Sequence, residues 1–218
     1  MNVLVACEFS QVVTRAFRER GHNAHSCDIL PTEGNPDWHI EGDVLEHLDD
    51  GWDLMIAHPP CTFLTLTGNK WFKPEYQDRF PTRHKDRAEA IEFFMAFAHA
   101  DIPHTCIENP LGIMSTKWRR PDQIIQPYQF GHIEAKLTCL WLKNLPPLRF
   151  GPAPQLMLGE TVPPSRTEIR TPEYVTFKSG KRMARWYVEA ASSPNRASIR
   201  SKTFPGIAQA MAEQWGQV

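Results

Sequence analysis

Short apolar segments alternate with helical patterns over the first 108 residues, and no other feature of this 218-residue chain constrains its fold as strongly. Four short segments are predicted as strands, over residues 2–7, 23–27, 52–57 and 103–108. Two longer segments have the apolar spacing of amphipathic helices, over residues 10–20 and 84–99. Strands that alternate with helices in this way form a mainly parallel sheet with helices on both faces. The predicted fold class is therefore α/β.

Two residues are expected to set boundaries within this pattern. Ser10 is a suitable N-cap for the first helix, because its hydroxyl can accept a hydrogen bond from a free amide of the first turn. Pro110 is expected to end the strand of residues 103–108, because proline cannot donate to a strand ladder and restricts the residue before it.

The pattern becomes less regular beyond Glu108. Two further strands are predicted over 128–130 and 138–142, and an amphipathic helix over 206–214. Residues 146–202 are rich in Pro, Ser, Arg and Lys, which predicts an irregular basic insertion that is either loosely built or a region of contact with nucleic acid. A chain of this length forms one domain. We divide it into a core of residues 1–145, the insertion of residues 146–202, and a C-terminal helix within residues 203–218 that returns to the core.

Charge is distributed unevenly along the chain. The net charge is −1, but residues 1–108 carry −9 and residues 109–218 carry +8. A basic half of this kind indicates a region that contacts a polyanion such as nucleic acid.

Composition excludes several classes of protein. No apolar run approaches the roughly 18 residues of a membrane span, and the N-terminus lacks the pattern of a secretory signal, so we expect a cytoplasmic protein. The five cysteines are widely spaced and form no C-x-x-C pair, which argues against a disulfide framework and a zinc ribbon. The cluster His22, His25, Cys27 and Asp28 is interpreted as polar residues near a strand end, and no metal site is predicted.

Polar and reactive residues follow the predicted strands. In parallel α/β sheets, ligands bind at the carboxyl ends of the strands, where Asp28, Asp43, Cys61 and Glu108 are expected. Cys61 follows a stiff diproline turn, and a free thiol becomes a strong nucleophile when nearby positive charge lowers its pKa. Glu108 is expected to be buried, which would raise the pKa of its carboxyl and let it donate a proton. The alternative for Cys61 is a buried structural thiol.

These two residues lie in segments that resemble a known family. Pro59-Pro60-Cys61, followed about 45 residues later by Glu108-Asn109-Pro110, resembles the Pro-Cys and Glu-Asn motifs of the cytosine-C5 DNA methyltransferases. The resemblance implies a Rossmann-like fold that binds S-adenosylmethionine, and a mechanism in which the Cys61 thiolate attacks C6 of a flipped cytosine. Glu108 would hold N3 protonated, and Lys136 would occupy the basic position of a diverged Gln-x-Arg-x-Arg motif. The catalytic residues implied are Cys61, Glu108 and Lys136.

The same resemblance implies a cofactor site and a substrate site. The cofactor-binding residues implied are Cys7, Glu8, Phe9, Ser10, Asp28, Asp43 and Pro59. The family's run of glycines after the first strand is absent, because Glu8 to Gln11 stand there instead. Residues 201–208 resemble the last motif, which returns to the cofactor pocket. The substrate-binding residues predicted are Pro60, Thr62, Asn69, Trp71, Asn109, Arg166, Arg185 and Arg200.

Other functions stay open at this point. Amino-group methyltransferases, which act on N4 or N6, have an aromatic residue where Cys61 stands. A tRNA cytosine-C5 methyltransferase shares the same core, and a catalytically silent nucleic-acid-binding relative would have kept the fold without the glycine loop. DNA is the predicted partner, with RNA as the alternative. The short insertion leaves no room for a full target-recognition domain, which fits a compact phage-type enzyme of short or absent sequence specificity. The oligomeric state stays open.

Overall fold

The computed structural model describes residues 1–151 and 168–217. Its main feature is a seven-stranded sheet of order β3-β2-β1-β4-β5-β7-β6. The first five strands of this order are mutually parallel, whereas β7 runs antiparallel to both β5 and β6. The strands are β1 Asn2–Ala6, β2 Asn23–Asp28, β3 His39–Glu41, β4 Leu54–Ala57, β5 His104–Pro110, β6 Gln123–Ile125 and β7 Thr138–Lys143. A mainly parallel α/β sheet is therefore confirmed.

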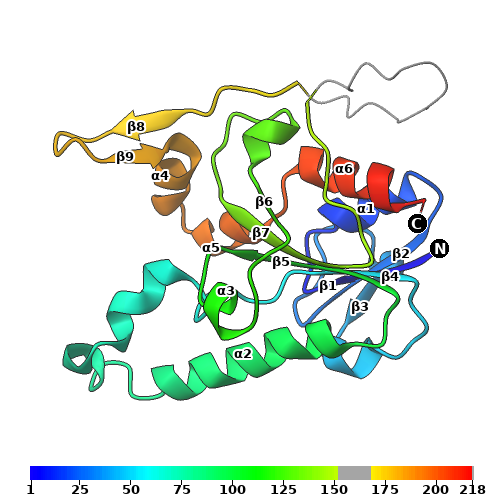
Figure 1. The fold of residues 1–218 in the computed structure, drawn as a ribbon, viewed down its shortest axis with the longest axis horizontal. Coiled ribbons are helices and arrows are strands. Elements are labelled where there is room, and N and C mark those ends of the chain that lie inside the picture. Colours follow the sequence, from blue (N-terminus) through cyan, green and yellow to red (C-terminus); the bar gives the residue numbers. More distant parts are fainter. Residues whose placement is uncertain (152–167, 218) are drawn as a thin grey trace.

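Helices cover both faces of this sheet (Figure 1). Helices α1 (Val12–Arg18) and α6 (Pro205–Trp215) pack on one face, and α2 (Arg83–His99) and α3 (Met114–Lys117) lie on the other. Because side chains alternate along a strand, Val3 and Val5 enter the first core, whereas Leu4 and Ala6 enter the second core with Phe94. Burial on both faces explains the continuous apolar character of the central strands.

Short 3₁₀ helices connect these elements. They cover Pro36–Trp38, Val44–His47, Leu66–Phe72, Pro74–Tyr76 and Pro127–Phe130. Within the described ranges, no helix is long and apolar enough to cross a bilayer.

The start of α1 differs from the prediction. The helix begins at Val12, its N-cap residue is Gln11, and Ser10 makes no capping hydrogen bond. Instead the buried carboxylate of Glu8 accepts hydrogen bonds from the amides of Val13 (2.7 Å) and Thr14 (3.1 Å). A carboxylate satisfies free amides at the end of a helix and also interacts favourably with the helix dipole, which explains why Glu8 replaces Ser10 as the cap.

Two strand predictions are also wrong. Residues 128–130 belong to the 3₁₀ helix Pro127–Phe130, because Gln126 and Gln129 form a reciprocal capping box at its start. β5 continues through Asn109 to Pro110, which pairs with Thr138 of β7. Pro110 lies beyond the part of β5 that pairs with β4, so this end of the strand is paired on one side only, where a missing amide hydrogen is tolerated.

The insertion is more ordered than its composition predicted. Its described part contains the hairpin β8 (Tyr174–Thr176) and β9 (Arg182–Ala184), followed by α4 (Arg185–Ala191) and α5 (Arg196–Ser201). An irregular structure is thus wrong for these residues. Gly180, at the tip of the hairpin, has a φ of 79°, which explains how so polar a segment forms a tight turn. The division of the chain into three parts stays a prediction.

Gly112 brings two loops of the carboxyl edge together. It forms an isolated bridge with Thr65, and a Cβ at position 112 would lie 2.2 Å from the carbonyl oxygen of Leu64. Gly112→Ala is therefore expected to lower the free energy of unfolding by about 1–3 kcal/mol, as overpacking does. Urea unfolding checks this, with Gly42→Ala as the control, because no atom lies within 4 Å of a Cβ at that position. Equal stability of the two variants would contradict the prediction.

Candidate active site at the carboxyl ends of the strands

A buried histidine–glutamate pair lies at the carboxyl ends of β4 and β5. His58 directly follows β4, and its Nδ1 lies 2.7 Å from Oε2 of Glu108 in β5. The two side chains are only 9% and 8% exposed. His58 was not among the predicted site residues. Its position at a strand end, before the two prolines, is the signal that could have identified it.

The pKa of Glu108 shifts in the direction opposite to the prediction. Burial acts to raise the pKa of this carboxyl, but the positive charge of Lys136 and the hydrogen bond with His58 together lower it below the ordinary value. The expectation of a raised pKa considered burial alone and is wrong for the free protein. Glu108 is therefore a carboxylate at neutral pH.

The Cys61 thiol is half-buried and is an electrostatic neighbour of the same groups. Burial raises its pKa most, the charge of Glu108 raises it further, and Lys136 acts against both. The thiol of the free protein is thus not activated, contrary to the expected lowering by positive charge. Cys61 also starts a tight turn, in which its carbonyl oxygen accepts hydrogen bonds from the amides of Leu64 (3.0 Å) and Thr65 (3.1 Å). Cys61, Glu108 and Lys136, the three residues predicted as catalytic, are therefore close enough to affect one another's ionisation.

Lys136 connects this site to the basic insertion. It precedes β7, and its Nζ donates a hydrogen bond to the carbonyl oxygen of Arg200 in α5 at 3.1 Å. The contact holds the ammonium group near Glu108 and Cys61, as its effects on their pKa values indicate.

These couplings predict how Cys61 reacts with iodoacetamide. Glu108→Gln removes a negative charge and is expected to speed alkylation by about three- to tenfold, whereas Lys136→Met slows it by a similar factor. In the wild type, the alkylation rate should rise with pH as the Cys61 thiol, whose pKa is raised, becomes ionised. Mass spectrometry of the Cys61 peptide measures these rates. Lys143→Met is the control, because this lysine lies at the other end of β7. Equal rates in all variants would contradict the electrostatic account.

Asn109 stabilises the diproline turn through a buried hydrogen bond. It is 2% exposed, and its Nδ2 donates a hydrogen bond to the carbonyl oxygen of Pro59 at 2.7 Å. Pro59 is buried and Pro60 is exposed. Asn109 was predicted to bind substrate, but the structure places it where it positions the turn that carries Cys61.

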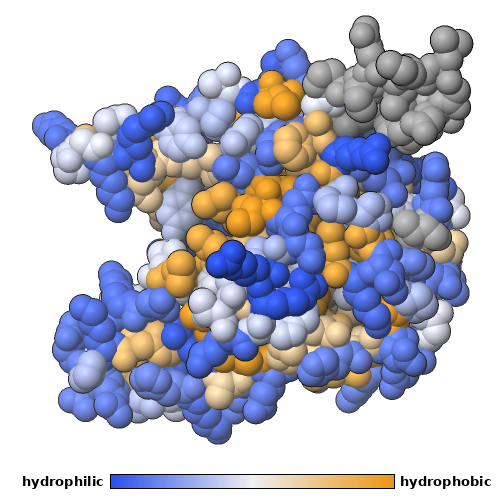
Figure 2. Space-filling view, in the orientation of Figure 1, coloured by the Kyte–Doolittle hydropathy of each residue, from blue (hydrophilic) through white to orange (hydrophobic). Residues whose placement is uncertain are grey.

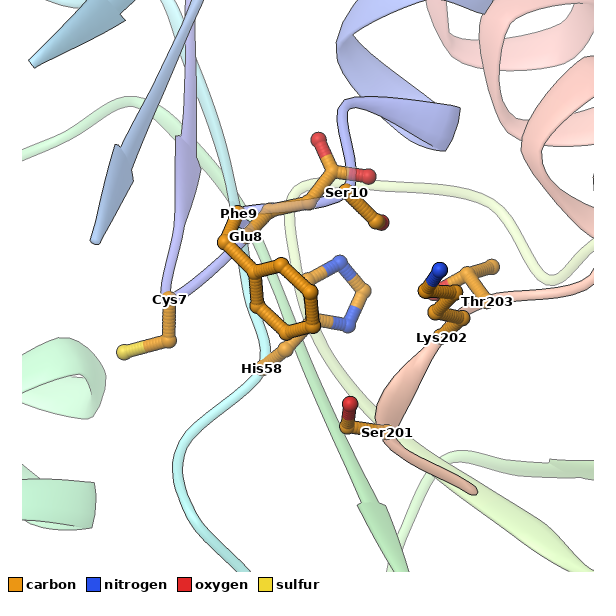
Figure 3. Close-up of a pocket in the computed structure, with 8 residues that line it drawn as sticks. All are labelled: Cys7, Glu8, Phe9, Ser10, His58, Ser201, Lys202 and Thr203. Carbon is orange, nitrogen blue, oxygen red and sulfur yellow. The ribbon is translucent and has the colours of Figure 1, made fainter. Parts of the chain in front are cut away.

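A pocket lies at the carboxyl end of β1, beside His58 (Figure 3). It is lined by Cys7, Glu8, Phe9, Ser10, His58, Ser201, Lys202 and Thr203. Residues 201–203, which come just before α6, thus lie against the loop after β1 although nearly 200 residues separate them in the chain. This arrangement brings the first and last motifs of the resemblance together.

Asp28 and Asp43 lie near the Cys7 end of the same loop. Burial raises the pKa of the Cys7 thiol well above its ordinary value, and the charges of both aspartates raise it further. Asp28 is the last residue of β2 and accepts a hydrogen bond from the amide of Leu30, whereas Asp43 caps the start of the 3₁₀ helix Val44–His47 by accepting one from the amide of Leu45. Two carboxylates therefore stand beside the loop after β1.

This loop adopts glycine-like conformations without glycine. Cys7 and Gln11 have φ values of 59° and 55°, in the left-handed region. The Gln11 side chain stabilises its turn, because its Nε2 donates to Ser26 Oγ (3.1 Å) and to the carbonyl oxygen of Asn35 (2.9 Å). Its Oε1 accepts from the Asn35 amide (2.7 Å). The loop thus makes sharp turns although it lacks the family's run of glycines.

Two of the predicted substrate residues, Asn69 and Trp71, lie on an arm of residues 66–82 that carries aromatic and basic side chains, and Thr62 precedes this arm. Thr62 is exposed, and Asn69 Oδ1 accepts a hydrogen bond from Arg87 Nη2 at 2.7 Å. Trp71 packs edge-to-face with Tyr76, with ring centroids 4.9 Å apart, so part of its ring area is already in contact. The arm therefore has internal packing of its own.

The predicted arginines of the insertion also make contacts within the chain. Arg185 pairs with Glu173 at 2.9 Å, and the Arg200 guanidinium lies 3.7 Å from the ring centroid of Tyr187. Arg166 lies outside the described residues. Arg185 and Arg200 therefore do not reach the site as free cations, because Arg185 is paired with a carboxylate and Arg200 is stacked on an aromatic ring.

An open notch separates the two projecting parts of the molecule. The arm of residues 66–82 and the β8–β9 hairpin project on the same side in Figure 1, and Figure 2 shows the hollow between them. Exposed lysines and arginines stand on both parts, at Lys70, Lys73, Arg79, Lys178, Lys181 and Arg182. Among the side chains that the structure describes, no three histidine, cysteine or acidic residues form a group able to hold a metal ion.

No family model matches the chain, and no curated protein matches its sequence. One similar solved structure is a prophage-encoded protein (E. coli) that is provisionally described as a DNA modification methyltransferase. The two share 13% sequence identity with a TM-score of 0.40, over 65% of this chain and 46% of that chain. The chain thus matches less than half of that protein, and a likeness at this level establishes neither a family nor an activity.

Proposed function

We propose that the protein is an S-adenosylmethionine-dependent DNA (cytosine-5-)-methyltransferase. The observation that carries the proposal is that Cys61, Glu108 and Lys136 are electrostatic neighbours at the carboxyl edge of a doubly wound sheet. A thiol nucleophile, a carboxylate and a cation are the groups that covalent attack on a pyrimidine requires. The carboxyl edge is also where such sheets bind their ligands.

The residues at the end of β1 fit the cofactor that this function requires. Asp28 and Asp43 can accept hydrogen bonds from ribose hydroxyls and an adenine amino group, and they lie near the Cys7 end of the loop. The pocket beyond this loop contains hydroxyl groups, Lys202 and a buried nitrogen of His58 that has no hydrogen-bond partner in the part of the chain that the structure describes, and these groups suit a polar ligand. S-adenosylmethionine supplies the methyl group when bound.

Substrate binding would remove one cause of the raised pKa of Cys61. In the free protein, the Glu108 carboxylate is one cause of this raised pKa. A cytosine protonated at N3 and paired with Glu108 neutralises this charge, whereas the charge of Lys136 remains. The thiolate is thereby favoured once the base is in place. Cys61 would thus become a nucleophile only when it has a target.

The reaction then balances at this site. As the Cys61 sulfur forms a bond to C6, the proton of its thiol passes to N3, where the negative charge of Glu108 stabilises it. C5 would then take the methyl group from the bound cofactor, which would be left as S-adenosylhomocysteine. A base removes the C5 proton, the electron pair of the S–C6 bond returns to sulfur, and sulfur regains the proton from N3. The target cytosine must leave the duplex stack, at a cost of a few kcal/mol that phosphate contacts offset. The basic residues on both sides of the notch can make such contacts.

The test uses tritiated S-adenosylmethionine with mixed-sequence DNA that contains 5-fluorocytosine. The fluorine cannot leave as a proton does, so the enzyme should remain attached to DNA in a denaturation-resistant, labelled adduct. A parallel reaction with 5-fluorocytosine RNA tests the alternative polyanion. Labelled DNA without an adduct would favour amino-group methylation. Absence of both label and adduct with either nucleic acid would overturn the proposal.

A further inference from the structure

One nitrogen of the His58 imidazole forms a hydrogen bond, and the other has no hydrogen-bond partner among the described residues. Nδ1 lies 2.7 Å from Glu108 Oε2, and because the pKa of Glu108 is lowered, the carboxylate accepts and Nδ1 donates. Nε2 is buried and has no hydrogen-bond partner among the described residues. A buried polar atom without a partner is unfavourable, so this nitrogen is arranged for a group that the free chain lacks.

The unpartnered nitrogen belongs to a side chain that lines the pocket at the end of β1. Figure 3 shows the nitrogen-bearing edge of His58 directed toward the space in front of Lys202 and Thr203. Ser10 and Ser201 line the same pocket. Three hydroxyl groups and one ammonium group around a small space are the donors that bind a carboxylate.

Charged groups face His58 from several elements. Glu8 approaches from the loop after β1, Glu108 from β5, and Lys202 from the segment before α6. Lys136 acts through Glu108, and Lys202 also pairs with Glu33. The protonated imidazolium donates from both nitrogens, so it can hold Glu108 and a second carboxylate at once.

We propose that His58 joins the cofactor to the catalytic carboxylate. Its Nε2–H donates to the carboxylate at the amino-acid end of S-adenosylmethionine, while its Nδ1–H holds Glu108 beside Cys61. Lys202 and the hydroxyl of Thr203 contribute to the same carboxylate site. The inference rests on the proposed function, because it names the contact that recognises one end of the cofactor. A bound cofactor thus orients Glu108 before the base enters.

Binding of two cofactor fragments tests this inference without turnover. S-adenosylhomocysteine keeps the amino-acid carboxylate, whereas 5′-methylthioadenosine lacks it. Calorimetry on the full chain should show that His58→Gln weakens S-adenosylhomocysteine binding by about tenfold, because the neutral amide cannot make a charge-assisted hydrogen bond to the carboxylate. Binding of 5′-methylthioadenosine should stay constant. The matched control His104→Gln, at the opposite end of β5, should bind both fragments as the wild type does.

Each outcome separates the inference from the proposed function. S-adenosylhomocysteine binding that is as tight in His58→Gln as in the wild type, or an equal weakening of both fragments in this variant, would overturn the role of His58 and leave the proposed function standing. Failure of both fragments to bind at any pH would overturn both. If His58→Gln does not fold, the imidazole proton signals of His58 in the wild type provide the test. S-adenosylhomocysteine must shift them and 5′-methylthioadenosine must not, and identical spectra would overturn the inference.

Discussion

Cys61→Ser is expected to abolish the covalent adduct with 5-fluorocytosine DNA and to lower methyl transfer by about 10³-fold or more. A serine hydroxyl ionises far less readily than a thiol, and the surroundings that oppose ionisation of Cys61 oppose it there too. The side chain changes by one atom, so the turn that begins at position 61 should persist. Gel analysis of the adduct and counting of labelled DNA measure the two losses.

The control for this variant is Cys106→Ala. Cys106 is fully buried in the core of β5 and cannot reach a substrate, so its loss should leave the adduct intact. Both variants should bind S-adenosylhomocysteine as the wild type does. An adduct that survives Cys61→Ser would refute Cys61 as the nucleophile.

Glu108→Gln is expected to lower methyl transfer by about 10²–10⁴-fold, the range typical of a positioned acid–base group. The amide has the shape of the carboxylate but no charge, so it cannot stabilise a proton at N3. The same variant should make Cys61 alkylate faster, as argued above. A slower methyl transfer together with a more reactive thiol would separate the loss of this charge from general damage to the site. Single-turnover kinetics measures the first quantity, and unchanged turnover would refute the role of Glu108.

The lowered pKa of Glu108 also predicts an effect of pH on stability. Because the folded-state pKa lies below the ordinary value, the ionised carboxylate stabilises the fold at neutral pH. This contribution is complete above the unfolded-state pKa and is lost as pH falls through the folded-state pKa. The free energy of unfolding of Glu108→Gln should therefore depend less steeply on pH in the acidic range than that of the wild type. Urea unfolding at several pH values below neutrality measures both slopes.

Some parts of the fold could not be predicted from local sequence patterns, because side chains outside the pattern determine the local structure. The cap of α1 was assigned to Ser10, since capping preferences are local, yet the buried Glu8 carboxylate reaches the same amides from the preceding turn. The strand predicted at 128–130 failed because a pair of glutamine side chains closes a 3₁₀ turn there. The order within the insertion was hidden by its polar composition, because a hairpin and short helices that are mostly exposed need few apolar residues.

The sequence by itself determined the alternation of strands and helices and the placement of Cys61 after β4 and of Glu108 near the carboxyl end of β5. Both follow from short-range periodicity and from turn residues, which are written in consecutive positions. Only the tertiary structure decided the ionisation of these two residues, because Lys136 and His58 reach Glu108 from other segments and outweigh its burial. It likewise brought residues 201–203 to the loop after β1 and left one nitrogen of His58 without a hydrogen-bond partner within residues 1–151 and 168–217. Charge and hydrogen bonding act through space, so a site of this kind is set by packing between segments that are far apart in the chain.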